Sequence, residues 1–134
     1  FAFWAMWSSP LLVATDPANL SAEKESILLN TEVIAINQDP LFVAGERIRN
    51  DNETTGGQLW YRPLANGDVC VILYNSGQHD NVPVAVSWSE IGWSVDDSVS
   101  IRDLWLHEEM GVMKEGYERS INAHDMAMLR LTKL

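Results

Sequence analysis

The sequence predicts a chain of two parts, in which a segment of mixed helix and strand precedes an antiparallel β-sandwich of the jelly-roll or Greek-key kind. Up to about residue 30, a continuous apolar run is flanked by segments with helical patterning. After Gly45, apolar residues occur in short runs that polar turns separate. The stretch TEVIAINQDPLFVAG at residues 31–45 separates the two patterns. We therefore expect a domain boundary there.

The first part is predicted to hold a helix, a buried strand and two further helices. Residues 1–9 are apolar nearly all round, and Pro10 ends this helix. Residues 11–14 form an apolar run too short for a helix, which favours a strand buried on both faces of a parallel sheet. Ser21 can cap the next helix, and the last helix ends before Pro40. This order is typical of the end of a repeated β/α fold.

The second part is predicted to be a series of short antiparallel strands. Asn66-Gly67 is a typical hairpin turn, residues 89–92 favour one helical turn, and residues 123–125 favour a turn before the last strand. Seven or eight strands at this spacing indicate a sandwich. The expected strands are residues 46–49, 59–62, 69–74, 82–88, 98–106, 110–113, 117–121 and 126–131.

Charge and composition exclude several classes of protein. The net charge is −10, which repels phosphate backbones and anionic lipid, so we expect neither nucleic acid nor a membrane surface as partner. No apolar run reaches the roughly 18–20 residues of a membrane span. Cys70 is the only cysteine, lies in an expected strand and is interpreted as a small buried hydrophobe. The chain starts at Phe1 within an apolar run, which suits part of a larger protein.

A series of short motifs runs along the whole chain in a fixed order. The most specific is EVIAINQDPL at residues 32–41, which Phe3-Trp4-Ala5 and Pro10-Leu11-Leu12 precede. In this order the motifs resemble those of the α-galactosidases of glycoside hydrolase family 27. The sequence departs once from that signature, with Phe42 where glycine is usual. The further matches are WYRPL at 60–64, Tyr74-Asn75, IRDLW at 101–105, Met110-Gly111-Val112, Ala123-His124-Asp125 and MLRL at 128–131.

The resemblance implies a (β/α)8 TIM barrel followed by a C-terminal antiparallel β-sandwich domain. On that basis residues 1–44 are the end of the catalytic barrel and residues 45–134 are the β domain. The family hydrolyses terminal α-D-galactosyl groups with retention, using two Asp carboxylates on earlier barrel strands. Neither has a counterpart here, so we assign no catalytic residue and expect this chain alone to be inactive.

The resemblance also implies the substrate, the cofactor requirement and the location of the parent enzyme. It implies an α-galactoside as substrate, no cofactor, and a secreted, lysosomal or vacuolar location. It leaves open a homodimer and the choice between galactose and N-acetylgalactosamine.

Three acidic positions are candidates for site residues. Asp16 follows the expected barrel strand, where barrel chemistry gathers, and is the candidate for substrate binding. The structural alternative, in which Asp16 bonds nearby amides at a turn, is favoured. Gln38 and Asp39 are expected to hold the domain junction. For Asp103 we expect a surface pair with Arg102 or a hydrogen bond that anchors a loop.

The remaining candidates are histidine, tryptophan and asparagine side chains. His79, His107 and His124 lack partners at the spacing of a zinc site, so no metal is expected. Trp93 is the best candidate for an exposed aromatic. Asn19 and Asn52 begin sequons for N-glycosylation, Asn19-Leu20-Ser21 and Asn52-Glu53-Thr54. The first overlaps the expected helix cap, and the cap is the favoured interpretation there, whereas the second lies in a polar hairpin loop that suits a glycan.

Two alternatives to an enzyme part remain open. One is a carbohydrate-binding β module that holds sugar on exposed aromatic side chains. The other is a structural module that docks on a partner barrel.

Overall fold

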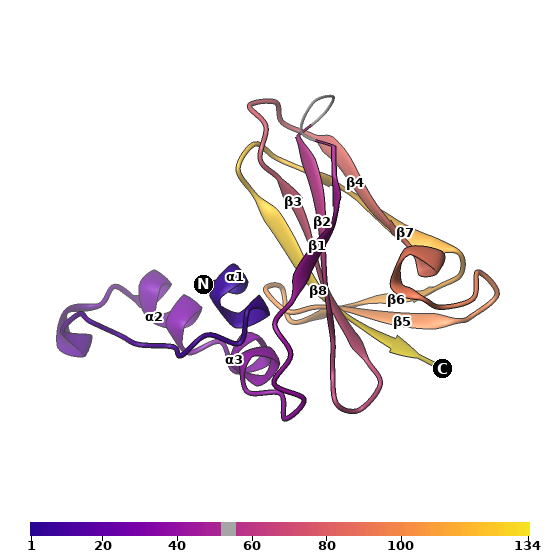
Figure 1. Cartoon of the computed structure of the whole chain (residues 1–134). Coiled ribbons are helices and arrows are strands. Elements are labelled where there is room, and N and C mark those ends of the chain that lie inside the picture. Colours follow the sequence, from indigo (N-terminus) through magenta and orange to yellow (C-terminus); the bar gives the residue numbers. More distant parts are fainter. Residues whose placement is uncertain (52–55) are drawn as a thin grey trace.

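The computed structural model describes residues 1–51 and 56–134, and Figure 1 shows its two parts. A helical segment (residues 1–44) lies to one side of a β domain (residues 45–134). Ser21 caps its second α-helix as predicted, because its Oγ accepts a hydrogen bond from the Lys24 amide. The elements of the helical segment are α1 (Ala2–Met6), η1 (Pro17–Asn19), α2 (Ala22–Leu28) and α3 (Thr31–Asn37).

The β domain contains the predicted antiparallel strands in two sheets. The larger sheet has the order β1-β2-β3-β8-β5-β6, and β4 pairs with β7 in the smaller sheet. One 3₁₀ turn, η2 (Trp88–Ile91), follows β4 where a helical turn was predicted. The strands are β1 (Glu46–Asn50), β2 (Gly57–Pro63), β3 (Val69–Asn75), β4 (Val82–Ser87), β5 (Val99–Asp103), β6 (Glu108–Met113), β7 (Gly116–Ile121) and β8 (Met126–Lys133).

The core between the two sheets follows from alternation along the strands. In β4, Val82, Val84 and Val86 are buried while the residues between them are more exposed. These side chains join Trp88 and residues from β2, β3, β5, β7 and β8 in one apolar cluster, which we call the inner cluster. Burial of such side chains stabilises the fold by about 1.5–3 kcal/mol each.

The opposite face of the larger sheet is covered by the helical segment. Cys70, Ile72 and Met128 on this face pack with Met6 of α1 and Val33 of α3 in a second apolar cluster, the outer cluster. β3 is therefore buried on both faces, which explains its unbroken apolar run from residue 69 to 73.

Turn chemistry sets where the strands end. Gly67 has φ of 89°, which glycine adopts at low cost, and the Leu64 amide donates to the Asp68 carbonyl across the predicted hairpin. The strand expected over residues 98–106 ends at Asp103, because the Asp103 side chain binds the amides of the following turn.

Two expectations for the helical segment were wrong. Residues 11–14 form no strand, and Leu12 and Val13 are 73% and 54% exposed. A strand needs a neighbouring strand to bond its backbone, and none lies beside this run among the described residues. The first helix ends at Met6 instead of Ser9, because Ser8 takes a left-handed φ of 54°.

Candidate functional site at the junction of the two parts

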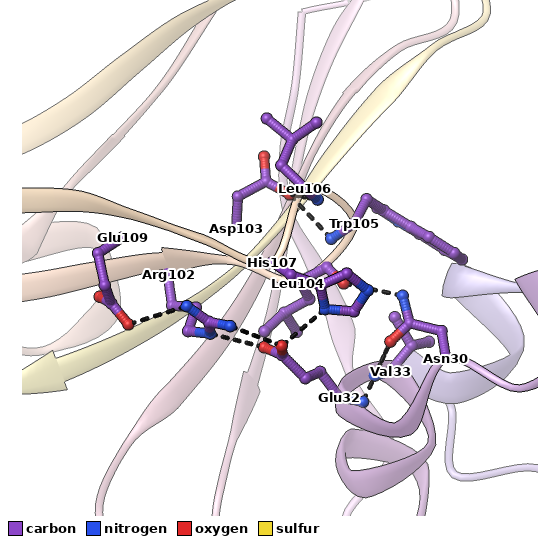
Figure 2. Close-up of polar contacts among 10 residues, drawn as sticks. All are labelled: Asn30, Glu32, Val33, Arg102, Asp103, Leu104, Trp105, Leu106, His107 and Glu109. Carbon is purple, nitrogen blue, oxygen red and sulfur yellow. Dashed lines mark hydrogen bonds and ion pairs between the residues drawn. The ribbon is translucent and has the colours of Figure 1, made fainter. Parts of the chain in front are cut away.

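The polar contacts between the helical segment and the β domain begin at Asn30, the N-cap of α3. Its Oδ1 accepts hydrogen bonds from the amides of Glu32 and Val33 at 3.1 and 3.0 Å. Its Nδ2 donates to the carbonyl of Leu104, 74 residues away, at 2.8 Å. One buried side chain thus satisfies the start of a helix and joins it to the turn after β5 (Figure 2).

Glu32 forms the centre of the junction. Its carboxylate accepts two hydrogen bonds from Arg102 of β5, at 2.8 Å from Nε and 2.7 Å from Nη2. His107 Nδ1 lies 2.7 Å from the same carboxylate, and Glu109 of β6 pairs with Arg102 at 3.2 Å (Figure 2). We call Asn30, Glu32, Arg102, His107 and Glu109 the junction cluster.

The contacts in this cluster favour the ionised forms of Glu32 and Arg102. The bidentate hydrogen bond from Arg102 lowers the pKa of Glu32 to about 2, with a further contribution from His107 and against the opposing effect of burial. The same bond raises the pKa of Arg102. Because Glu32 is ionised at any ordinary pH, its chemistry is that of a fixed anchor and not of a proton donor.

Asp103 fixes the turn that presents Leu104 and His107 to α3. Its Oδ1 accepts from the amides of Trp105 and Leu106, both at 2.9 Å, and its Oδ2 pairs with Arg119 of β7 at 2.5 Å. The predicted loop-anchoring bond is confirmed. The alternative of a surface pair with Arg102 was wrong, since Asp103 is 1% exposed and Arg102 faces Glu32.

A hollow of about 440 Å³ adjoins this turn, and its lining includes Asp103, Trp105 and Arg119. The carboxylate of Asp103 is already occupied by two amides and a guanidinium. The hollow therefore offers no free acid and base pair from these residues.

Arg62 and Asp39 form the second set of junction contacts. The guanidinium of Arg62 is fully buried, and it donates to the Ala5 carbonyl at 2.8 Å and to Ser8 Oγ at 3.3 Å. Burial lowers its pKa. Asp39 accepts from the amide of Ala65 in the β domain at 3.0 Å, which confirms that Asp39 holds the junction.

Gln38, the other residue expected at the junction, acts differently. It donates to Asn37 Oδ1 at 2.6 Å, and Asn37 in turn donates to the Ser9 carbonyl at 2.8 Å. Gln38 therefore supports contacts within the helical segment.

Asp16 is exposed and caps η1. It accepts from the Ala18 amide at 3.0 Å and from Asn19 Nδ2 at 2.6 Å, as the structural alternative requires. Substrate binding by Asp16 remains a prediction. Asn19 itself is exposed, whereas Asn52 lies outside the described residues.

Other candidates stand as follows within residues 1–51 and 56–134. No group of three or more metal-ligating side chains occurs in them, and none of their helices is long and apolar enough to cross a membrane. Cys70 is buried, and burial raises its pKa to about 12, which leaves an inert thiol. The expectation that Trp93 is exposed was wrong. Trp93 is partly buried, since it packs against Trp88 and the inner cluster.

Sequence reasoning missed three residues that matter most at the junction. Asn30 does carry a local signal, because an Asn directly before an acidic first turn is a typical N-cap. The roles of Glu32 and Arg62 had no local signal, since their partners lie 70 and 57 residues away.

Comparison with known proteins gives a consistent assignment. The family described as α-galactosidase C-terminal β-sandwich domain matches residues 54–131, and that described as α-galactosidase A matches residues 1–39. α-Galactosidase 3 of Arabidopsis thaliana is 39% identical over 133 residues, which cover 98% of this chain and 30% of that protein. The chain thus spans about a third of the length of such curated relatives.

Two solved structures are similar over nearly the whole chain. α-Galactosidase I from Mortierella vinacea has a TM-score of 0.90 at 29% identity, covering 98% of this chain and 34% of that one. A β-L-arabinopyranosidase from Geobacillus stearothermophilus has a TM-score of 0.86 at 22% identity, covering 98% and 28%. The second likeness shows the fold alone.

Proposed function

The chain belongs to the family of α-galactosidase C-terminal β-sandwich domains, and from this premise we propose that it is the structural C-terminal part of a retaining glycosidase that removes terminal α-D-galactosyl groups. The curated relatives that it matches include α-galactosidases of Arabidopsis thaliana and Oryza sativa, and it covers about a third of their length. The catalytic carboxylates lie, on this proposal, in the barrel strands outside this chain.

We assign residues 1–44 to the end of the barrel and residues 45–134 to the β domain. The last helix ends at Asn37 and the first strand begins at Glu46, which supports a boundary between them. The junction cluster then serves to hold the last barrel elements in one orientation on the β domain.

The observation that carries the proposal is the two-sided character of the helical segment. One side packs in the outer cluster and bonds the β domain through Asn30 and Glu32. Large apolar side chains elsewhere on the segment are exposed. They are Trp4 at 41%, Trp7 at 45%, Leu12 at 73%, Val13 at 54% and Leu29 at 61%. Apolar surface of this extent marks a contact with further protein, and the rest of a barrel supplies it.

The test compares this chain with the full polypeptide that carries it. The chain alone is expected to release no product from an aryl α-galactoside, whereas the full polypeptide is expected to hydrolyse it with retention. Proton NMR of the released sugar measures the anomeric configuration. Product from the chain alone would overturn the structural role. An inactive but folded full polypeptide would overturn the parent activity.

We further propose that the protein enters the secretory pathway, as a secreted or vacuolar enzyme. The support is its likeness to the plant α-galactosidases. Fractionation of cells that express the full polypeptide tests this, and recovery in the cytosol alone would contradict it.

A second candidate function is sugar binding by an aromatic surface. Trp7 is 45% exposed, and its ring lies 5.9 Å from that of Trp60, over which Arg47 is placed. Galactose titration followed by Trp fluorescence tests this candidate. A shift that Trp7→Ala abolishes and Trp93→Ala retains would support it, and no shift would reject it.

A further inference from the structure

The sequon Asn19-Leu20-Ser21 lies on the surface loop that joins residues 11–14 to α2. We propose that Asn19 is an N-glycosylation site of the folded protein. The proposal rests on the passage through the secretory pathway proposed above, and not on the galactosidase activity. The target chemistry is a lipid-linked oligosaccharyl diphosphate whose reducing sugar is N-acetylglucosamine.

The loop leaves Asn19 accessible. Asn19 is exposed and ends the short η1 turn instead of lying within a long element. It is polar and lies six residues after Val13, the last large exposed apolar residue of the run that the proposed barrel contact covers. A bulky glycan at this place displaces none of the residues of the inner or outer cluster, because Asn19 belongs to neither. The fold therefore tolerates the modification.

The hydrogen bond of the Asn19 amide is compatible with a glycan. Nδ2 donates to Asp16 Oδ2 at 2.6 Å, and this contact uses one of the two N–H bonds of the primary amide. Glycosylation replaces one N–H and leaves the second as a donor, so a glycosylated amide can still bond Asp16.

A hollow beside Asn19 offers space to the first sugar. Its apolar residues can contact the C–H face of a pyranose, and the ammonium of its lysine can donate to hydroxyl or acetamido oxygens. The hollow measures about 350 Å³ and is lined by Thr15, Asn19, Leu20, Lys24, Ile27 and Leu28.

The transfer step balances without an oxidant or reductant. A bond forms between Asn19 Nδ2 and C1 of the N-acetylglucosamine, and the bond from C1 to the lipid diphosphate oxygen breaks. One amide proton leaves, and the lipid diphosphate departs with the bonding electrons. Ser21 supplies the sequon hydroxyl and, in the folded chain, caps α2 with Oγ 3.4 Å from the Lys24 amide.

The experiment uses the full polypeptide that carries this chain, expressed through the secretory pathway of a eukaryotic host. Peptide N-glycosidase in heavy-oxygen water converts a glycosylated Asn to labelled Asp, which mass spectrometry of the Asn19 peptide detects. Asn52→Gln removes the other sequon of this chain, so that the mass of the glycan on Asn19 is resolved. His124→Ser introduces a control sequon at the exposed Asn122.

Label on Asn19, with loss of one glycan in Asn19→Gln and Ser21→Ala and its retention in Ser21→Thr, is the expected result. An unlabelled Asn19 peptide beside a labelled Asn122 control peptide overturns the proposal. The galactosidase assay is read separately: a glycosylated inactive protein counts against the proposed function, and an active protein with bare Asn19 against the glycan alone.

Discussion

The two faces of the six-stranded sheet are buried by different means. The inner cluster is built of apolar side chains from both sheets, with Trp88 at 0% exposure. The outer face also has an apolar cluster, but it is bordered by Asn30, Glu32 and the buried Arg62. Apolar contacts supply cohesion without direction, whereas hydrogen bonds fix an orientation. The difference indicates that the outer face must hold the helical segment at one angle.

The inner face should give the largest single effect. Trp88→Ala is expected to lower the free energy of unfolding by about 3–5 kcal/mol, because it removes the largest fully buried side chain of the described residues and leaves a cavity in the inner cluster. Urea unfolding measures the loss. Trp4→Ala, at a side chain that is 41% exposed, is the matched control and should cost clearly less in the isolated chain. Equal losses of unfolding free energy in the two variants would contradict the larger contribution that we expect from the inner cluster.

Arg62 provides the next largest effect, at the outer face. Arg62→Ala is expected to cost about 2–4 kcal/mol, because the Ala5 carbonyl loses its buried donor and the space of the side chain is emptied. Arg62→Met keeps most of the volume and removes the buried charge, so its cost should be smaller. Both variants lose the hydrogen bonds and only Arg62→Ala also loses the volume, so urea unfolding of the two separates packing from bonding. Equal costs would show that the packing of the side chain contributes nothing.

Asn30 tests whether capping and docking can be separated. Asn30→Ala should cost about 1–2 kcal/mol, since it removes both the cap of α3 and the donor to Leu104. Asn30→Asp keeps the cap and loses the donor. Amide hydrogen exchange should then show Val33 still protected and Trp105 exchanging faster. An unchanged exchange rate at Trp105 would show that the hydrogen bond from Asn30 to the Leu104 carbonyl does not stabilise the turn.

Glu32 makes the junction sensitive to acid. Its pKa is about 2 in the folded protein, below its usual value of 4.5. The contribution to stability is therefore complete above about pH 4.5 and is lost as the pH falls toward 2. Because the side chain is 26% exposed and water screens the pair, we expect about 1–2 kcal/mol.

Urea unfolding between pH 6 and 2.5 measures this loss. The other carboxylates titrate in the parent and in the variants alike, so their effect cancels in the comparison. Glu32→Gln should lose less unfolding free energy between pH 6 and 2.5 than the parent. Glu109→Gln should resemble the parent, because Glu109 pairs with the same arginine but its side chain is 60% exposed. Indistinguishable profiles for the parent and Glu32→Gln would refute the assignment.

The sequence predicted what local patterns encode. β3 was recognisable because burial on both faces requires an unbroken apolar run, and Asn66-Gly67 because few residues adopt a left-handed turn. The strand over residues 11–14 was wrong, since a strand depends on neighbours that no local pattern supplies. The pairing of Glu32 with Arg102 was missed for a related reason: 70 residues separate them.

Phe42, the departure from the family signature, should give the smallest effect. It has φ of 53° and is 78% exposed, so an aromatic residue occupies a conformation that favours glycine or asparagine. Phe42→Asn is expected to stabilise the chain by about 0.5–1 kcal/mol, because Asn tolerates the left-handed region. Phe42→Ala removes the ring without relieving the backbone and should change little. Equal stability of the two variants would show that the ring, and not the backbone, decides the energy at this position.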